Sequence, residues 1–421
     1  MKRSILGLFK KAFAALLVSL TAVQVFSHGS VNNYESGQNR LISFPDTSDY
    51  LTISSDLHTH SVFSDGHVWP NIRVSEALKD GIDSIAITEH LEYQPHTLFI
   101  PNNDRNSAYI EAEKAAEGSD LIVIAGSEIT REMPPGHLNA VFISDANKLF
   151  KMDKKDLPEA RKRIREVLGD VELPEEEREI AEKYALGNIW SPFEALEEAN
   201  KQGAFVFWNH PMWGAQASDG IARVTEMHKM FIKQNLMHGI EIVNTYTYSE
   251  EAFSLALEND LTLIGTSDVH NLIEWDYDSA KNEHRPVTLI FAKDRTADSM
   301  KQALFAGRTV VFFKNRLIGK EENLIPLLNS VITIDSEGYR GNSEILTLKL
   351  KNNSTSSIIL QNISEYSFAN FDDIISIPKN GQVTLIVKTL EILETIDLSF
   401  NVLNALVKPK VNAKVSFRVE I

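Results

Sequence analysis

Histidines and carboxylates stand in this chain in short motifs of the kind that bind metal ions. The first motif reads Asp56-Leu57-His58-Thr59-His60 and is followed by Ser64-Asp65-Gly66. The apolar residues Leu51-Thr52-Ile53 before it predict a strand, whose two-residue side-chain period places His58 and His60 on one face. Two imidazoles on one face can chelate zinc, manganese or iron. Asp65, in the Ser-Asp-Gly turn, can fold back toward the same point.

Six further residues of these types stand at an end of an apolar run, where a predicted strand begins or stops. They are His90, Glu128, His137, His210, Asp268 and His270. A single His-x-His motif is better explained by an ordinary strand with two histidines, but the repetition of the pattern argues against that explanation. Since (β/α) barrels and open α/β sheets build their active sites at strand ends, the sequence predicts a metal site on such a fold.

These motifs resemble those of the PHP (polymerase and histidinol phosphatase) family of metallohydrolases, over residues from about 50 to 315. The resemblance is carried by His58-x-His60, Asp65, Thr88-Glu89-His90, Gly126-Ser127-Glu128, His137, Asn209-His210-Pro211 and Ser267-Asp268-Val269-His270. It implies a distorted seven-stranded (β/α) barrel with two or three divalent metal ions, commonly zinc, manganese or iron. It also implies three ligand sets: His58, His60 and Asp268 for one metal, a bridging Glu128 with His137 and His210 for a second, and Asp65, His90 and His270 for a third.

Phosphoester hydrolysis is the reaction that this resemblance favours. Two metal ions held close together can stabilise both the attacking and the leaving oxygen at phosphorus, and a metal-bound hydroxide is the expected nucleophile. Glu128 suits a bridge because its carboxylate has two oxygens, and we expect Glu128, Asp268 and Arg131 to be catalytic residues. The chain contains no cysteine, which excludes thiol catalysis.

The choice of substrate stays open at this point. The N-terminal segment, the domain order and the segment Ile87 to Tyr93 resemble exported PHP phosphodiesterases that act on small organic phosphate diesters. A phosphomonoesterase of the histidinol phosphate phosphatase kind conflicts with export, and hydrolysis of a carbamate, ester or amide would use the same hydroxide. The complete ligand set disfavours a metal-dependent protein that only binds a partner.

Several side chains outside the ligand motifs are candidates for substrate contacts. Arg131 follows Glu128 by three residues and could hold a phosphate through its several donors, with a salt bridge at the surface as the alternative. Arg285 follows the last ligand motif, and a phosphoryl site should keep one of these two arginines near the metals. Tyr246, together with Trp213 and Trp275, could form an apolar wall for an ester group.

One carboxylate and two possible acids complete this set of candidates. Asp56 precedes the His-x-His motif and is better placed to orient a ligand imidazole than to bind metal. Tyr93 and His96 follow His90, and either could protonate a leaving group.

Charge favours a small substrate over a polymer. The chain has 42 Lys and Arg against 58 Asp and Glu, a formal net charge of −16. Proteins that grip long nucleic acids normally show a basic stripe. The basic residues from Lys148 to Arg165 alternate with acidic ones, which fits a solvated helix face. We therefore expect a small phosphorylated substrate and no nucleic acid, and an oligomer is possible.

The first 27 residues are typical of a signal peptide. Lys2, Arg3, Lys10 and Lys11 precede the apolar stretch from Ala12 to Phe26, which is short for a membrane span. Cleavage after Ser27 would leave no stable membrane insertion, and an uncleaved anchor is the alternative. We expect a periplasmic or secreted protein that is stable without disulfides.

The rest of the chain divides into an α/β barrel and a small β domain. Residues 28–320 are predicted to form the distorted (β/α)7 barrel, with a charged, helix-rich insertion at about 145–200 that is either a lid or substrate wall or a peripheral excursion. Alternating apolar residues and Asn-Asn-Ser and Lys-Asn-Gly turns predict an antiparallel, sandwich-like all-β domain over 325–421.

Overall fold

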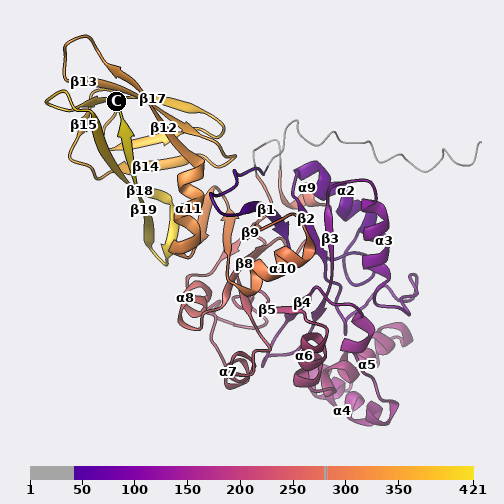
Figure 1. The fold of residues 1–421 in the computed structure, drawn as a ribbon. Helices are drawn as coiled ribbons and strands as arrows, with labels where there is room; N and C mark the ends of the chain where they lie inside the picture. The colour runs from indigo at the N-terminus through magenta and orange to yellow at the C-terminus, as the bar shows by residue number, and fades with distance from the viewer. Residues whose placement is uncertain (1–41, 279–280, 282) are drawn as a thin grey trace, which may run out of the picture. The chain divides into compact units, whose positions relative to one another are not determined.

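The computed structural model describes residues 42–278, 281 and 283–421 (Figure 1). The predicted signal peptide lies outside these residues. Within the described ranges, no helix combines the length and the hydrophobicity that a bilayer-spanning segment requires.

A mixed sheet with a parallel-rich centre forms the core of the α/β region. Its strands are β1 (Leu51–Asp56), β2 (Ser84–Ile87), β3 (Ile122–Ile129), β4 (Leu138–Val141), β5 (Phe205–Trp208), β6 (Gly239–Asn244), β7 (Thr247–Tyr248), β8 (Thr262–Thr266), β9 (Val287–Ala292), β10 (Thr309–Phe313) and β11 (Arg316–Gly319). The β1–β2–β3, β5–β6 and β6–β8 pairs are parallel, and β4 runs antiparallel between β3 and β5. The antiparallel strands β9 and β10 continue the sheet beyond β1.

Two threonines bring the ends of this sheet together. The Thr288 hydroxyl accepts from the Gly265 N–H at 3.0 Å, and the Thr309 hydroxyl donates to the Leu263 carbonyl at 2.8 Å. These bonds hold β8 against β9 and β10, so the sheet curls into a barrel. The strands β2, β4, β5, β6, β8 and β9 are buried along their whole length, and apolar side chains such as Ile53, Phe207 and Ile264 pack in one cluster.

Helices lie around the outside of the strands (Figure 1). They are α2 (Pro70–Asp80), α3 (Ser107–Ala116), α6 (Pro192–Lys201), α7 (Glu226–Lys233), α8 (Glu250–Glu258), α9 (Ile273–Asp276) and α10 (Ala297–Phe305). The sequence of α8 explains its place: Ser249 caps the first turn by accepting from Ala252 N–H, and one face buries Phe253 and Ala256.

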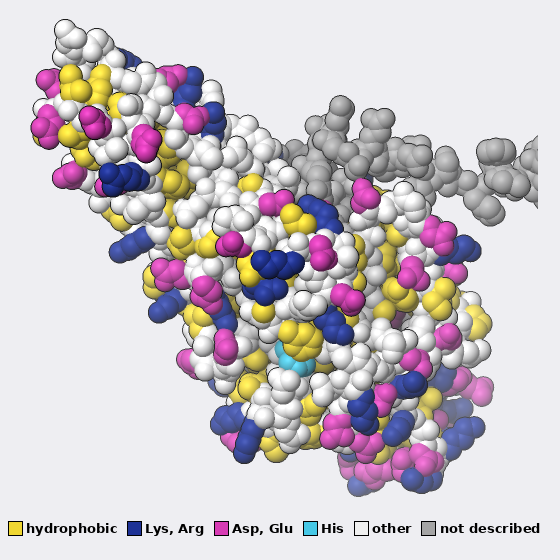
Figure 2. Space-filling model, in the orientation of Figure 1, with side chains coloured by type: hydrophobic (Ala, Val, Ile, Leu, Met, Phe, Trp, Pro, Cys, Tyr) yellow, Lys and Arg dark blue, Asp and Glu magenta, His cyan; other side chains and the backbone are white. Residues whose placement is uncertain are grey.

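A helical segment separates β4 from β5, where the sequence predicts an insertion. It contains the short 3₁₀ helices η2 (Ala146–Leu149) and η3 (Lys154–Asp156) and the helices α4 (Leu157–Leu168) and α5 (Glu175–Ile189). Ala160 of α4 packs against Ala185 and Leu186 of α5. Acidic and basic side chains interleave on the face of these helices shown in Figure 2, with pairs such as Lys162–Glu166. This mixture is a solvated helix surface and not a basic patch.

The C-terminal region is all β after the connecting helix α11 (Glu321–Val331). Its strands are β12 (Ile332–Tyr339), β13 (Ile345–Asn352), β14 (Ile358–Asn362), β15 (Ser367–Phe368), β16 (Ile374–Ile377), β17 (Gln382–Lys388), β18 (Thr395–Lys408) and β19 (Val411–Glu420). One antiparallel sheet has the order β12-β13-β17-β15, and β16, β14, β18 and β19 pair antiparallel opposite it. Alternate residues such as Leu346, Leu348 and Leu350 are fully buried between the sheets. The predicted fold class, an α/β barrel followed by a small β domain, is confirmed.

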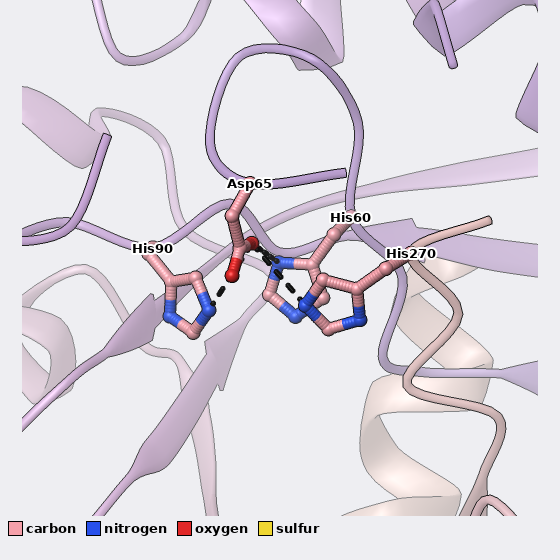
Figure 3. Close-up of side chains that lie close together, drawn as sticks. All are labelled: His60, Asp65, His90 and His270. Carbon is pink, nitrogen blue, oxygen red and sulfur yellow. Dashed lines mark ion pairs between the residues drawn. The ribbon is translucent and has the colours of Figure 1, made fainter. Parts of the chain in front are cut away.

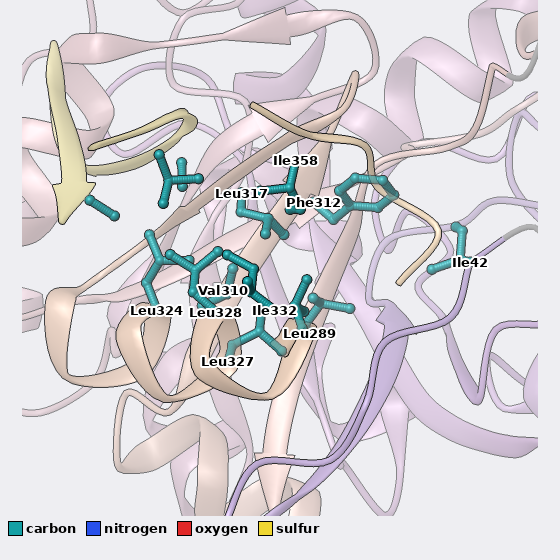
Figure 4. Packing of buried hydrophobic residues seen from close by; sticks show 14 of the residues in the cluster. Ile42, Leu289, Val310, Phe312, Leu317, Leu324, Leu327, Leu328, Ile332 and Ile358 are labelled. Carbon is teal, nitrogen blue, oxygen red and sulfur yellow. The ribbon is translucent and has the colours of Figure 1, made fainter. Parts of the chain in front are cut away.

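The barrel and the β domain share hydrogen bonds and a hydrophobic core. Strand β11 pairs in parallel with β18, with Leu317 opposite Ala405. The shared core joins residues of β9 and β10, such as Leu289 and Val310, to α11 and to Ile358 of β14 (Figure 4). The barrel sheet thus continues into the β domain, so strand pairing and a shared core join the two regions directly.

Candidate metal centre

The structure brings the nine predicted ligand side chains together at one edge of the barrel sheet. They are His58, His60, Asp65, His90, Glu128, His137, His210, Asp268 and His270. Most follow or end the parallel strands β1, β2, β3, β5 and β8, whose carboxyl ends meet at this edge. His137 precedes a strand, and it reaches the same edge because β4 runs antiparallel to its neighbours. Three groups of these residues have ligand atoms within 4.8 Å of one another.

The first group contains His58, His60, Glu128 and Asp268. The Nε2 atoms of His58 and His60 lie 3.0 Å apart, and each is 3.1 Å from Asp268 Oδ1. Glu128 Oε2 lies 3.1 Å from His58 Nε2 and 3.2 Å from His60 Nε2. Two imidazole nitrogens that face each other and the same carboxylates require positive charge between them, which protons on the rings or a divalent cation can supply.

The second group surrounds Asp65 (Figure 3). Its Oδ1 lies 3.2 Å from His270 Nε2 and 3.4 Å from His90 Nε2, yet this buried oxygen accepts no hydrogen bond. The turn is so tight that a Cβ added to Gly66 would lie 2.7 Å from the Ser61 nitrogen. That close approach explains why glycine follows Asp65 and why the carboxylate points back to the centre.

The third group shows that the two oxygens of Glu128 serve different histidines. Oε1 lies 2.7 Å from His137 Nδ1 and 3.5 Å from His210 Nε2. Oε2 faces His58, His60 and His90, the last at 3.2 Å. This division is the geometry that a carboxylate bridge between two metal ions requires.

The electrostatics of the centre also fit cations. Burial alone would lower the pKa of His58, but Asp268, Glu241 and Glu128 outweigh it and raise that pKa well above its ordinary value. In the same way, burial would raise the pKa of Glu128, but His90, His58 and His137 hold it well below its usual range. The buried carboxylates therefore demand positive charge, which protons on the histidines or bound metal ions can provide.

Two residues around the centre were not anticipated from the sequence. The Arg73 guanidinium donates to the backbone carbonyls of His60 at 2.7 Å and His270 at 2.8 Å, and so it clamps the two ligand loops. Glu241 accepts from His58 Nδ1 at 2.8 Å. For Glu241 the available signal was a charged residue inside the otherwise uncharged run Gly239–Asn244.

The predicted arginine contacts point elsewhere. Arg131 is buried, its Nη2 pairs with Glu92 Oε1 at 3.1 Å, and its Nη1 donates to the Gly187 carbonyl of α5. The pair is thus internal and not the surface salt bridge considered as the alternative. Arg285 is 1% exposed and donates to Asp80 at 2.8 Å and Asp56 at 3.2 Å. These contacts do not support a role in substrate binding for either arginine. That role stays a prediction.

The prediction that Asp56 orients a ligand imidazole is wrong. Its carboxylate accepts from Ser267 N–H at 3.1 Å and from Ser267 Oγ at 2.5 Å, besides pairing with Arg285. Because Ser267 directly precedes Asp268, Asp56 supports the ligand loop through the backbone and not through a ring nitrogen.

Aromatic side chains flank the centre. The Trp213 ring lies 5.3 Å from His210 and 5.5 Å from His137, and Trp213 is 49% exposed. On another side the Tyr93 ring lies 6.2 Å from His90 and also 6.2 Å from Tyr184 of α5. The helical insertion therefore borders the site.

The other two predicted aromatic residues lie differently. The Tyr246 ring packs 5.2 Å from Tyr277, and its hydroxyl donates to the Asp276 carbonyl. Trp275 is 72% exposed. Of the three predicted aromatics, Trp213 is the one whose ring the structure places against ligand rings, and the substrate contact of Tyr246 stays a prediction.

Comparisons with known proteins agree with this arrangement. The PHP domain model matches residues 56–235, and an Ig-like domain model matches residues 332–418. The ligand positions Asp268 and His270 lie beyond the first match. No curated protein matches the chain.

Solved structures extend the comparison. A two-domain protein from Bacteroides vulgatus, which contains a predicted PHP-like metal-dependent phosphoesterase, is 34% identical with a TM-score of 0.75, over 91% of this chain and 99% of that chain. A predicted metal-dependent phosphoesterase from Bifidobacterium adolescentis is 18% identical (52% and 89% covered, TM-score 0.37). An amidohydrolase from Chromobacterium violaceum is 17% identical (52% and 87% covered, TM-score 0.35). Because the identity to the first of these spans nearly the whole of both chains, this chain belongs to the PHP family, as a two-domain member in which an Ig-like domain follows the PHP domain.

Proposed function

We propose that this protein is a metal-dependent phosphodiesterase that hydrolyses small organic phosphate diesters. The observation that carries the proposal is the convergence of nine ligand side chains around Glu128, whose two oxygens face separate groups of histidines. Divalent cations bound here would supply a water of lowered pKa and would offset negative charge at phosphorus.

The donors divide into three sets in this proposal. They are His58, His60 and Asp268; Glu128 with His137 and His210; and Asp65, His90 and His270. Imidazole and carboxylate donors suit zinc, manganese and iron, so the proposed cofactor is two or three of these ions. Glu128 would hold two ions at once, and the Asp268 and Glu128 carboxylates would keep both sites electrically attractive to cations.

The surroundings of the centre favour a diester over a monoester. A diester carries one negative charge at neutral pH, whereas a monoester carries about −1.5 to −2. The ion pairs that the structure shows for the ligand carboxylates are all with histidines, and both candidate arginines are paired with other carboxylates. The rings of Tyr93 and Trp213 offer apolar surface for the two ester groups of a diester.

The engagement of both arginines also favours a second candidate function. A carbamate, ester or amide needs no cationic side chain for a phosphate, and the same metal ions could activate water toward its carbon. Hydrolysis at carbon is therefore the alternative that the experiment below must separate.

We also infer the setting of the reaction. The net charge of −16 and the interleaved charges on α4 and α5 favour a small phosphorylated substrate over nucleic acid. Export to the periplasm or beyond rests on the composition of residues 1–27, and the oligomeric state is left open by this proposal.

The test compares three chromogenic substrates with the purified mature protein loaded with Mn²⁺ or Zn²⁺. Bis-p-nitrophenyl phosphate reports diesterase activity, p-nitrophenyl phosphate monoesterase activity and p-nitrophenyl acetate attack at carbon. The control is Glu128→Gln, which keeps the size of the side chain but removes the charge of the proposed bridge. We expect diester turnover to exceed monoester turnover and to vanish in the control. Preference for p-nitrophenyl acetate would indicate hydrolysis at a carbonyl carbon instead of at phosphorus. A lack of turnover with all three substrates would contradict a hydrolase function.

A further inference from the structure

Glu241 is a carboxylate at the metal centre that is outside the nine ligands. It lies in β6, where every residue is buried, and it is itself fully buried. We propose that Glu241 is a positioning residue that holds three ligand residues at once: His58, His210 and Asp268. The inference rests on the proposed metal site but not on the identity of the substrate.

The contact with His58 sets the protonation of its ring. Glu241 Oε1 lies 2.8 Å from His58 Nδ1, with both side chains fully buried. A carboxylate can only accept, so Nδ1 carries a proton, and Nε2 is left as the ring nitrogen for a metal ion on the side where His60, Glu128 and Asp268 lie. Second-layer carboxylates act in this way on metal-binding imidazoles, fixing the tautomer and making the ligand nitrogen more basic.

The other oxygen of Glu241 supports two ligand residues whose backbones are in the left-handed region. Oε2 accepts from His210 N–H at 2.6 Å and from the Asn244 side-chain amide at 2.9 Å, and this amide also lies 3.3 Å from Asp268 Oδ2. His210 has φ 28° and Asp268 has φ 51°. Non-glycine residues persist in this region when their surroundings hold them there, and Glu241 does so directly for the His210 backbone, whereas it reaches only the side chain of Asp268, through the Asn244 amide.

The donors around Glu241 leave it no free position for a metal. Oε1 accepts from His58 Nδ1 and from the Thr266 hydroxyl at 2.6 Å, and Oε2 accepts from His210 and Asn244. A carboxylate has about four lone-pair positions, and here four donors occupy them. Glu241 is therefore a positioning residue and not a tenth ligand.

The test uses Glu241→Gln in the full chain. The amide keeps the volume, but it turns one acceptor into a donor that must face His58 and Thr266 or His210 and Asn244. We measure Zn²⁺ affinity by competition with a chromophoric chelator, the absorption spectrum of the Co²⁺-loaded protein, and the urea stability of the metal-free protein. We expect about a 10- to 100-fold loss of Zn²⁺ affinity and a changed Co²⁺ spectrum.

Asp80→Asn is the matched control. It also converts an ion-pair carboxylate to an amide, although Asp80 is 13% exposed, and Asp80 pairs with Arg285 and is not one of the groups around the ligands. We expect it to lower stability while Zn²⁺ affinity stays within about twofold of wild type. If Glu241→Gln behaves like Asp80→Asn, with stability lost and affinity kept, the positioning role is overturned.

Asn244→Ala provides a second variant if Glu241→Gln does not fold. It removes the link between Glu241 and Asp268 but keeps the bonds of Glu241 to His58 and His210, and we expect a smaller fall in Zn²⁺ affinity. Unchanged affinity in Asn244→Ala would overturn the link to Asp268. A wild-type protein that binds no metal would overturn both this inference and the metal site, whereas metal binding without phosphoester turnover would overturn only the proposed function.

Discussion

Asp56 and Arg285 form an ion pair in which both side chains are completely buried, with 3.2 Å between Oδ2 and Nη1. Burial raises the pKa of the Asp56 carboxyl, while Arg285 and Ser267 oppose that rise. Since Asp56 also binds Ser267, the residue before Asp268, this pair supports one of the ligand loops from inside the barrel. A pair with this role is expected to matter for folding before it matters for substrate.

Replacing Arg285 by methionine should destabilise the protein strongly. The change leaves the Asp56 and Asp80 carboxylates without their cation, and breaking a buried ion pair typically costs about 3–5 kcal/mol. Urea unfolding of the metal-free protein measures this loss. The double variant Asp56→Asn with Arg285→Met should recover part of it, because one buried charge is then removed. An Arg285 that binds substrate would instead raise KM with little change in the free energy of unfolding.

Arg131 offers a similar distinction at the helical insertion. Its guanidinium joins Glu92 to the Gly187 carbonyl of α5, so Arg131→Met should loosen α4 and α5 and leave a buried carboxylate unpaired. We expect faster proteolytic cleavage between these helices, and a loss of turnover that is similar for a charged diester and for neutral p-nitrophenyl acetate. If turnover falls for phosphate esters alone, Arg131 contacts the phosphate.

The ligand set could be predicted because its signal is local. His58-x-His60 on one strand face and a histidine or carboxylate at each strand end are visible within a few residues. The arginines could not be placed in this way. Arg131 is three residues from Glu128 but lies beyond β3, which ends at Ile129, so the strand period does not predict where its side chain points.

Glu241 and the shared core escaped prediction because their partners are distant in sequence. His58 lies 183 residues before Glu241, and no pattern within β6 identifies His58 as the partner of this carboxylate. The pairing of Leu317 with Ala405 likewise joins segments that the sequence assigns to separate domains. The alternation in Leu346, Leu348 and Leu350 predicts strands but not what the completed sheets pack against.

Trp213 should influence which ester groups the site accepts. Its exposed ring lies against the rings of His137 and His210, so it can stack on an aromatic leaving group. Aromatic pairs contribute about 0.5–1.5 kcal/mol, so Trp213→Ala should lower kcat/KM for bis-p-nitrophenyl phosphate by up to about tenfold. The effect should be smaller for a diester with one methyl group, and Zn²⁺ affinity should not change. An equal loss for both diesters would argue against stacking.

His228 should make the stability of the protein fall in mild acid. Its ring is fully buried 4.0 Å from the Trp208 ring, Nε2 donates to the Pro135 carbonyl at 2.7 Å, and Nδ1 accepts from Thr225 N–H at 3.2 Å. Burial lowers its pKa from 6.5 to about 4, against the bond to Pro135, which raises it. A proton on Nδ1 would face the Thr225 N–H, so the neutral ring is the one that fits.

The sign of the pH dependence follows from this lowered pKa. The unfolded chain binds a proton at His228 near pH 6.5 and the folded chain only near pH 4, so acid favours unfolding between these values. The contribution is fully present above pH 6.5 and declines as the pH falls, and the total loss is about 3 kcal/mol once both states are protonated. In His228→Gln, urea unfolding should show a shallower loss between pH 6.5 and pH 4 than in wild type. The difference at pH 8 isolates the packing cost of the substitution, and parallel curves in the two proteins would contradict the role of His228.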